Sequence, residues 1–177
     1  MLNFKRSARQ FGSAAGAEIA EAALVLPLVF TLLLGIIWFG RAFNIYSTIQ
    51  QAAQQGAITA ARATCVTCTP GNQFPSKAEV QTAVAAVLQS SNLSLNQIKA
   101  SASPVVTSCP PPAPAGGCTK TTNNIWVCRT VQLNTTPPLQ CGSIVSFQYP
   151  FQFYLPFTSL NLQQVVLSAQ AQSRMEN

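Results

Sequence analysis

A long uncharged segment near the N-terminus constrains the fold of this chain more than any other feature. Residues 22–40 read AALVLPLVFTLLLGIIWFG and contain no charged side chain. A helix rises about 1.5 Å per residue, so about 20 apolar residues cross the ~30 Å hydrocarbon layer of a bilayer. We therefore predict a transmembrane helix over residues 17–40, with the rest of the chain outside the bilayer.

Two carboxylates lie at the entrance to this segment. Glu18 and Glu21 directly precede the apolar residues, and Gly16 lies in a run of small side chains before them. A charged side chain costs about 2.5–3.5 kcal/mol at the centre of a membrane helix and less near its ends, so a carboxylate there usually has a function. We interpret Glu21 and Glu18 as functional residues that need a cationic partner.

The distribution of positive charge predicts the topology. The formal net charge is +6, but charged residues make up only 8% of the chain, and Lys5, Arg6 and Arg9 lie within its first nine positions. Basic residues accumulate on the cytoplasmic side of membrane helices. We therefore predict a cytoplasmic N-terminus, a membrane boundary at Arg41 and an exterior domain beyond it, and we expect no nucleic-acid binding.

A secretory signal peptide is the main alternative for the N-terminus. The apolar region of a signal peptide is shorter than this one and ends at a cleavage site of small residues. Here the apolar segment ends in WFGR at residues 38–41, and the small residues with Gly16 come before it. That order suits a peptidase that acts on the cytoplasmic face, removes a leader of residues 1–16 and leaves the helix on the product.

The helix is expected to begin near Ala17 and Glu18 and to end near residue 63. Pro27 lies inside it, where the missing N–H and the ring predict a kink. Over residues 41–64 the apolar and polar side chains separate onto two faces. The apolar face narrows to alanine and glycine, so we expect a sheet to pack closely on this spine. Its members are Phe43, Tyr46, Ile49, Ala53, Gly56, Ala57, Ala60 and Ala61.

The exterior domain, residues 65–177, is predicted to be α+β. Ser76 and Glu79 have the spacing of a capping box, which predicts a second helix over residues 76–90 with its valines and Leu88 on one side. Alternation with period two then predicts a small antiparallel sheet of three or four strands. The alternating segments are residues 98–103, 125–133, 145–155 and 162–172.

The last two of these segments are expected to bury one face against the helices. Pro150 lies on the other face and predicts an edge strand or a bend. The residues expected to point inward are Val145, Phe147, Tyr149, Phe151, Phe153, Leu155, Val165, Leu167, Ala169 and Ala171.

Six cysteines follow the membrane segment, and their even number predicts a disulfide framework outside the cytoplasm. They are Cys65, Cys68, Cys109, Cys118, Cys128 and Cys141. Redox or zinc chemistry at Cys65 and Cys68 is the alternative, but a preceding helix C-terminus does not lower thiol pKa values, and a chain without histidine leaves only four-cysteine zinc. Pairing Cys109 with Cys118 would close the Pro-rich loop between them, although the sequence leaves the pairing open.

Catalysis has no residues to support it. The chain contains no His, and its four acidic residues are all Glu, at positions 18, 21, 79 and 176. The usual general acids and bases are therefore nearly missing from the exterior domain. We expect no enzyme activity, no metal site and no cofactor.

Several of these motifs together resemble the TadE/TadG-like family of pilin-like proteins from tight-adherence (Tad, or Flp-type) pilus systems. Gly16 is followed five residues later by Glu21, residues 21–27 read EAALVLP, and residues 39–41 read FGR at the membrane exit. The Ala/Gly-rich helix up to Arg62 and the terminal strand sequences at 145–156 and 168–176 agree with the same family. Ala22 departs from the commoner Phe, and the cysteine-bearing insertion is particular to this chain.

The resemblance implies a minor pilin or pseudopilin with a class III signal peptide. A prepilin peptidase would cut after Gly16, Ala17 would become the N-terminus, and Glu21 would pair with the new ammonium of a neighbouring subunit. Implied partners are other pilin or pseudopilin subunits and the Tad assembly machinery. The implied location is the bacterial inner membrane, with the C-terminal domain periplasmic or extracellular. The alternative is a bitopic membrane protein whose exterior domain is a binding or adhesion module that enters no filament.

Overall fold

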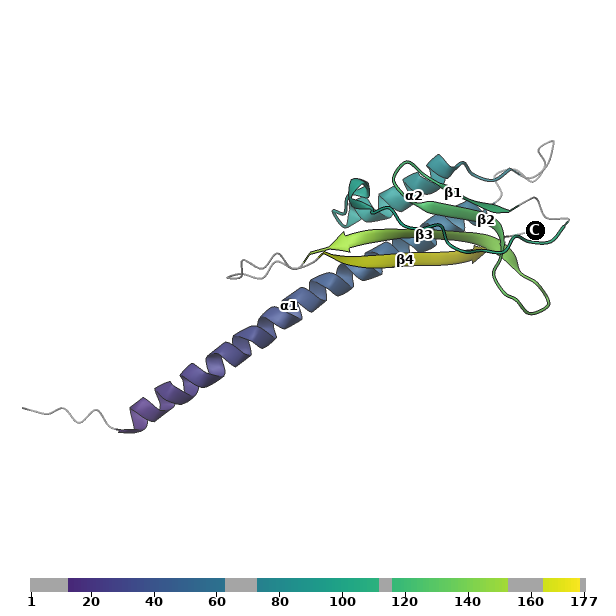
Figure 1. Ribbon diagram of the computed structural model, residues 1–177. Helices are drawn as coiled ribbons and strands as arrows, with labels where there is room; N and C mark the ends of the chain where they lie inside the picture. Colours follow the sequence, from purple (N-terminus) through teal and green to yellow (C-terminus); the bar gives the residue numbers. More distant parts are fainter. Residues whose placement is uncertain (1–12, 63–72, 112–115, 153–163, 176–177) are drawn as a thin grey trace, which may run out of the picture. The chain divides into compact units, whose positions relative to one another are not determined.

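A computed structural model describes residues 13–62, 73–111, 116–152 and 164–175 (Figure 1). The chain divides into two compact units, Met1–Arg41 and Ala42–Asn177. The predicted features at Cys65, Cys68, Phe153 and Leu155 lie outside the described residues, as does most of the leader.

One helix, α1 (Ser13–Ala61), contributes residues to both units. It begins about one turn before the predicted start, because Ala14, Ala15 and Ala17 have high helix propensity and extend it toward the N-terminus. The backbone remains helical through Pro27 and ends close to the predicted position.

The second predicted helix is confirmed as α2 (Lys77–Ser90). Ser76 is its N-cap: the Ser76 hydroxyl accepts from the Glu79 N–H at 3.3 Å, and the Ser76 N–H donates to Glu79 Oε2 at 2.5 Å. This capping box satisfies two of the backbone donors that a helix start leaves unpaired. Val80, Val84 and Leu88 are buried, as their spacing predicts.

Within the described residues, four strands form one antiparallel sheet in the order β1-β2-β3-β4, which confirms the α+β class (Figure 1). The strands are β1 (Gly117–Lys120), β2 (Trp126–Gln132), β3 (Cys141–Phe151) and β4 (Val165–Arg174). The β2–β3 register is irregular between Cys128 and Val131, whereas β3 and β4 pair without interruption.

The predicted strand at residues 98–103 is wrong. A 3₁₀ helix, η1 (Leu95–Gln97), precedes it, and the segment has one isolated backbone bridge to the sheet, from Lys99 to Gln148, instead of a continuous ladder. Its Ala/Ser alternation lacks the β-branched and aromatic residues that pack well on a sheet. Strand β1 was not predicted from the sequence. It pairs with β2 in a short hairpin, and the turn of this hairpin includes Asn124 at a φ of 60°.

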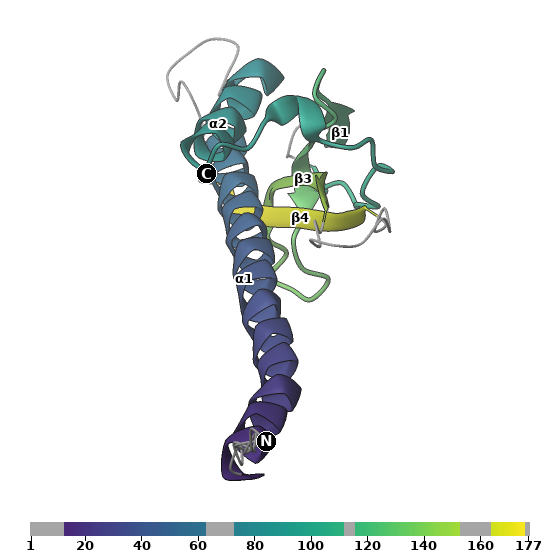
Figure 2. The ribbon, with the colours of Figure 1, turned by 90° about the vertical axis from the view of Figure 1, so that its left-hand side faces the viewer.

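The main core lies between the sheet and the two helices of the second unit, which cover the same side of the sheet (Figure 2). On α1 the buried face beyond Ile49 consists of small side chains. Gly56 is the closest approach: a Cβ there would lie 2.7 Å from Val84 Cγ2 and 3.3 Å from Val145 Cγ1. The predicted close packing on Ala and Gly is thus present from Ile49 onward. The buried α1 residues in this core are Ile49, Ala52, Ala53, Ala57 and Ala60.

The predicted inward faces agree with the structure except at their ends. Val145, Phe147, Tyr149 and Phe151 are buried, and so is Ala169. Phe43, Tyr46 and Val165 were expected inside but are 72%, 45% and 43% exposed. All three precede the buried stretch of their own element, so the core simply ends before it reaches them.

Pro150 lies near the end of β3, a central strand, and not on an outer strand of the sheet. However, the pairing of β3 with β2 ends at Ser146. On the same side of β3, the isolated bridge from Lys99 to Gln148 is the last backbone pairing among the described residues. Beyond Gln148, β3 pairs with β4 alone, so a residue without an N–H breaks no ladder on the open side.

A smaller apolar cluster lies apart from the main core. Cys128, Val131 and Ile144 are buried there, with Val106, Cys118 and Leu133 packed against them. Val106 belongs to residues 101–109, which we name the strap. The strap joins the sheet through Thr107 O, which accepts from the Gln132 N–H at 2.8 Å, and through the Cys109 N–H, which donates to Thr130 O at 2.9 Å.

Candidate functional site

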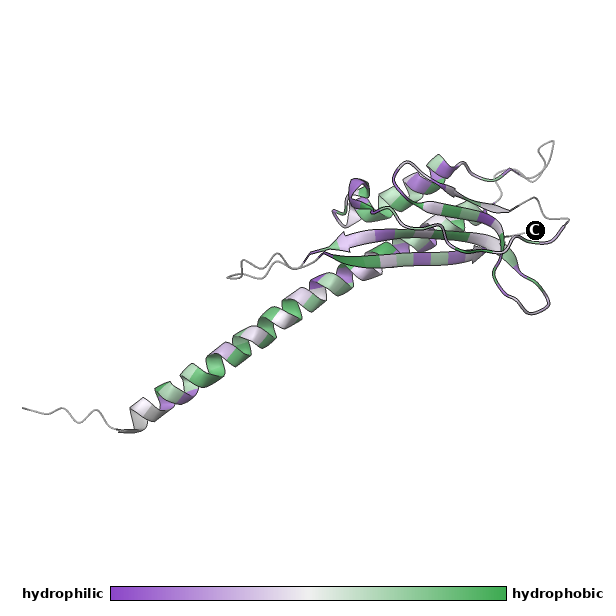
Figure 3. Ribbon diagram, viewed as in Figure 1, coloured by the Kyte–Doolittle hydropathy of each residue, from purple (hydrophilic) through white to green (hydrophobic). Residues whose placement is uncertain are grey.

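The part of α1 within the first unit presents an almost entirely apolar surface (Figure 3). Within the described residues, one helix is long and apolar enough to cross a membrane, and none of its most hydropathic 18-residue window is buried. A continuous exposed surface of this kind belongs against lipid or other helices and not in water. Its large exposed side chains are Ile19, Leu24, Val25, Leu26, Leu28, Val29, Phe30, Leu32, Leu33, Ile36, Ile37 and Phe39.

Glu18 and Glu21 lie at the N-terminal edge of this surface, and both are exposed. A spacing of three residues places them on the same face of the helix. Residues 13–40 contain no Lys or Arg, so the neighbouring turns of α1 offer no cation to either carboxylate. A partner for these charges must come from another part of the chain or from another molecule.

Gly16 lies five residues before Glu21 on α1. Packing within the described structure does not require a glycine at position 16. A Cβ at Gly16 would meet no atom within 4 Å, in contrast to Gly56, and Gly16 lies within regular helix. Neither close packing nor a positive φ therefore accounts for a glycine at this position.

Pro27 and Thr31 lie in the middle of the apolar surface. Pro27 has no N–H to donate to the carbonyl four residues earlier, and the Thr31 hydroxyl donates to Leu28 O at 2.9 Å. The kink expected at Pro27 stays a prediction.

Arg41 ends the first unit beside an aromatic ring. Its guanidinium lies 5.8 Å from the centroid of the Trp38 ring, a cation–π distance. Trp and Arg both combine an apolar body with a polar tip, and both are enriched where a helix leaves the hydrocarbon layer. The pair fits the membrane boundary predicted at Arg41.

The four described cysteines form two disulfides, Cys109–Cys141 and Cys118–Cys128. Of the pairings that the sequence left open, the structure therefore does not contain the one between Cys109 and Cys118. Cys118 and Cys128 lie directly opposite each other in the β1–β2 register, with a Cα–Cα distance of 3.9 Å, while Cys109 joins the end of the strap to the first residue of β3. The pairing depends on β1, which the sequence did not reveal.

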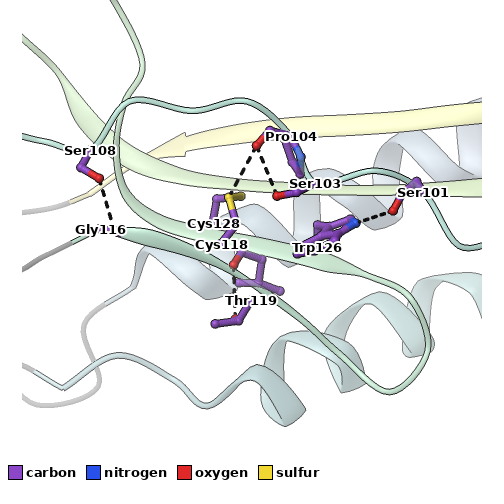
Figure 4. Close-up of a disulfide and its surroundings, with 10 residues drawn as sticks. Ser101, Ser103, Pro104, Ser108, Gly116, Cys118, Thr119, Trp126 and Cys128 are labelled. Atoms are coloured by element: carbon purple, nitrogen blue, oxygen red, sulfur yellow. Dashed lines mark hydrogen bonds between the residues drawn. A yellow bond between two sulfur atoms is a disulfide. The ribbon is translucent and has the colours of Figure 1, made fainter.

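Polar contacts hold the strap beside the Cys118–Cys128 disulfide (Figure 4). Trp126 Nε1 donates to Ser101 O at 3.0 Å, and the Ser108 hydroxyl donates to Gly116 O at 3.3 Å. Gly116 passes so close to Thr130 that a Cβ would lie 2.1 Å from the Thr130 carbonyl oxygen. Disulfides and hydrogen bonds thus fasten this part of the domain where little apolar core is available.

Among the described residues of the domain, two titratable groups have shifted pKa values. Burial raises the pKa of Tyr149, and the hydrogen bond from the Ser94 N–H partly opposes that shift. Burial lowers the pKa of Arg129, partly opposed by the Glu79 carboxylate, and Arg129 Nη2 donates to Pro75 O. Both side chains fasten the loops around α2 to the sheet, since Tyr149 also donates to Gln97 Oε1 at 2.6 Å.

Comparison with known proteins identifies one segment. No curated protein and no solved structure matches the chain. Residues 16–57 match the family model described as TadE-like protein, the family that the sequence motifs resemble. The match begins at Gly16 and includes both carboxylates, the apolar surface and Arg41. The match shows that residues 16–57, less than half of the chain, are similar to TadE-like proteins, and we refer to them as the TadE-like segment.

Proposed function

We propose that this chain is a minor pilin or pseudopilin of a Tad-type pilus, whose α1 helix leaves its leader and packs against the helices of other subunits. The observation that carries the proposal is the position of Glu21. This carboxylate is exposed at the edge of an apolar helix surface, has no cation in the neighbouring turns, and lies within the TadE-like segment.

In this proposal a prepilin peptidase of the membrane cuts between Gly16 and Ala17. The new ammonium at Ala17 lies about one turn before Glu21, and a carboxylate in a first helical turn is favoured by the helix dipole. When helices stack in register, the ammonium of one subunit pairs with Glu21 of the next. The cost of placing Glu21 at the hydrocarbon edge then selects the correct alignment, because only the aligned subunit supplies the partner charge.

The domain beyond Arg41 faces the periplasm or the exterior in the proposed orientation. The three basic residues before the helix remain in the cytoplasm, as the positive-inside rule favours. The two disulfides are consistent with that side of the membrane, because thiols in the cytoplasm are kept reduced.

Processing is tested by the intact mass of the full chain purified from its native membrane. We expect a product that begins at Ala17. Gly16→Ala should not weaken the helix, because a Cβ at position 16 has open space and alanine has the higher helix propensity, yet it should reduce cleavage. Native protein that retains its first 16 residues and still functions would favour the membrane-anchored binding module.

Assembly is tested by Glu21→Gln, and Glu18→Gln is made in parallel to compare the two carboxylates. Both variants remove one exposed carboxylate from the same helix face. We expect Glu21→Gln to insert into the membrane normally and to be missing from sheared pili or from the assembly complex. If Glu21→Gln is incorporated as well as the unmodified chain, the register role of Glu21 is wrong.

A further inference from the structure

A groove of about 160 Å³ lies on the face of the sheet that points away from the helices, and we name it the outer groove. Phe147 and Ala169 point into the main core, so their neighbours along β3 and β4 point to the opposite face. The strap borders the groove on one side. The polar side chains that line the groove are Ser101 of the strap, Ser146 and Gln148 of β3, and Ser168 and Gln170 of β4.

The β3–β4 register sets the spacing of the groove floor. Ser146 lies opposite Gln170, and Gln148 lies opposite Ser168. The two glutamines therefore lie on a diagonal between neighbouring strands, about 7–8 Å apart. A compact ligand that rests on the floor can reach both carboxamides at once.

The strap forms a wall of the outer groove that is fastened at both ends (Figure 4). The indole Nε1 of Trp126 donates to Ser101 O at 3.0 Å where the strap begins. The Cys109–Cys141 disulfide joins the other end of the strap to β3. Wall and floor are thus positioned before a ligand arrives, and a preformed site loses less conformational entropy on binding.

The polar side chains of the outer groove have unused hydrogen-bonding capacity. Within the described part of the chain, none of the five side chains hydrogen-bonds to another protein group. Each Ser hydroxyl and each Gln carboxamide can donate as well as accept. The described residues that line the groove carry no formal charge. The groove therefore offers donors and acceptors together, without electrostatic selection for an anion or a cation.

This chemistry favours one class of ligand. Anions bind to Arg, Lys or helix N-termini, and hard cations bind to carboxylates. Apolar ligands bind in pockets lined mainly by apolar and aromatic side chains. Sugar hydroxyls both donate and accept, as do the side chains on the groove floor. We propose that the outer groove binds one neutral sugar ring of a saccharide, with Gln148 and Gln170 hydrogen-bonding to hydroxyls on opposite sides of the ring.

An extended peptide is the main alternative occupant. Within the described residues β4 forms an edge of the sheet, and a peptide strand can add to such an edge through its backbone. An added strand would lie beside β4, however, and would leave Ser146 and Gln148 on β3 without partners. The groove lies entirely in the second unit, so the proposal depends on neither leader cleavage nor Glu21.

Binding is tested with the full chain in phosphatidylcholine nanodiscs, which contain no sugar. The probes are the methyl glycosides of glucose, galactose, mannose and N-acetylglucosamine, each followed by saturation-transfer NMR. We expect at least one to bind with a dissociation constant on the order of 1 mM, because ligands of so few atoms gain little binding free energy. Methyl glucuronide, which adds a carboxylate to the same ring, should bind no better than methyl glucoside.

Substitutions of single glutamines locate the site. Gln148→Ala and Gln170→Ala should each raise the dissociation constant about three- to tenfold, because each removes a hydrogen bond to the ligand. Neither side chain has a partner among the described residues, so both variants should fold, which circular dichroism checks. Gln172→Ala is the matched control. Gln172 is an exposed glutamine on the same face of β4 but outside the groove, and its loss should leave the dissociation constant unchanged.

Three results would overturn the proposal. The first is the absence of saturation transfer to all four glycosides at concentrations well above about 1 mM. The second is a Gln172→Ala chain that loses as much affinity as the Gln170→Ala chain, because binding would then not be located in the groove. The third is tighter binding of methyl glucuronide than of methyl glucoside, because a cation outside the groove would then determine affinity. An acetylated peptide of alternating Val and Thr that binds when all four glycosides fail would assign the β4 edge to peptide recognition instead.

Discussion

Gly56 of α1 and Val84 of α2 approach so closely that a Cβ on Gly56 would lie 2.7 Å from Val84 Cγ2. Val84 is fully buried and β-branched, so it has little freedom to turn away. The missing side chain on Gly56 allows the side chains of Val84 from α2 and Val145 from β3 to pack directly against the backbone of α1.

Gly56→Ala is expected to destabilise the domain. Overpacking of a core costs about 1–3 kcal/mol, and the gain in helix propensity of about 1 kcal/mol offsets only part of it. Thermal unfolding of the full chain in detergent micelles, followed by circular dichroism, measures the difference. Gly40→Ala is the control, because a Cβ there meets nothing within 4 Å. A Gly56→Ala chain as stable as the unmodified one would contradict the packing described.

Ser76→Ala removes the N-cap of α2. The Glu79 N–H then loses its acceptor, and we expect a loss of about 1 kcal/mol in the free energy of unfolding. Ser90→Ala, at the exposed end of the same helix, removes only a local bond to Val87 O and should have a much smaller effect. Denaturant unfolding of both variants checks this, and equal losses would show that the capping box contributes little.

The two disulfides should differ modestly in their contribution to the free energy of unfolding. Cys109–Cys141 closes a separation of 32 residues and Cys118–Cys128 one of 10 residues. The chain-entropy relation gives about 4 and about 3 kcal/mol, respectively. Paired Cys→Ser variants, with both partners of one bridge replaced, test this by denaturant unfolding. A greater loss from removing the shorter bridge would indicate native-state effects beyond loop closure.

Tyr149→Phe should reduce the alkaline loss of stability. The folded pKa of Tyr149 is raised above its ordinary value of 10.0 because the ring is buried. The unfolded chain therefore ionises first, and stability that is fully present below pH 10 is lost as the pH rises toward the raised folded pKa. Without the hydroxyl this loss disappears. Unfolding free energies of the two chains between pH 8 and about 11 measure the effect.

Near neutral pH the same variant should be less stable by about 1–3 kcal/mol, because Gln97 Oε1 and the Ser94 N–H lose their partner. Tyr46→Phe is the control, since its ring is 45% exposed. Identical alkaline profiles for the Tyr149→Phe and unmodified chains would contradict the assignment.

Local sequence signals predicted the elements whose reasons are local. The length of the apolar run predicts a membrane-spanning helix, and the Ser76–Glu79 spacing predicts the start of α2. The alternation of Val145, Phe147, Tyr149 and Phe151 predicts the buried face of β3. In each case the signal lies within the element's own sequence, although the face of β3 is buried by residues of α1 and α2.

Features that depend on partners far away in the sequence were not predicted. β1 is only four residues long and exists because β2 pairs with it, and both described disulfides follow from that register and from the position of the strap. The failed strand at residues 98–103 has the alternation but not the side chains to hold a place in the sheet. In the candidate site, the sequence supplied Gly16 and Glu21, but their exposure and the open space at Gly16 required coordinates.

The Cys109–Cys141 bridge has a consequence for proteolysis. A single cut anywhere between Cys109 and Cys118 would separate the polypeptide into two fragments, yet Cys109 on the first remains covalently joined to Cys141 on the second. A chain cut once in this stretch would thus keep its C-terminal fragment covalently attached to the fragment that contains α1.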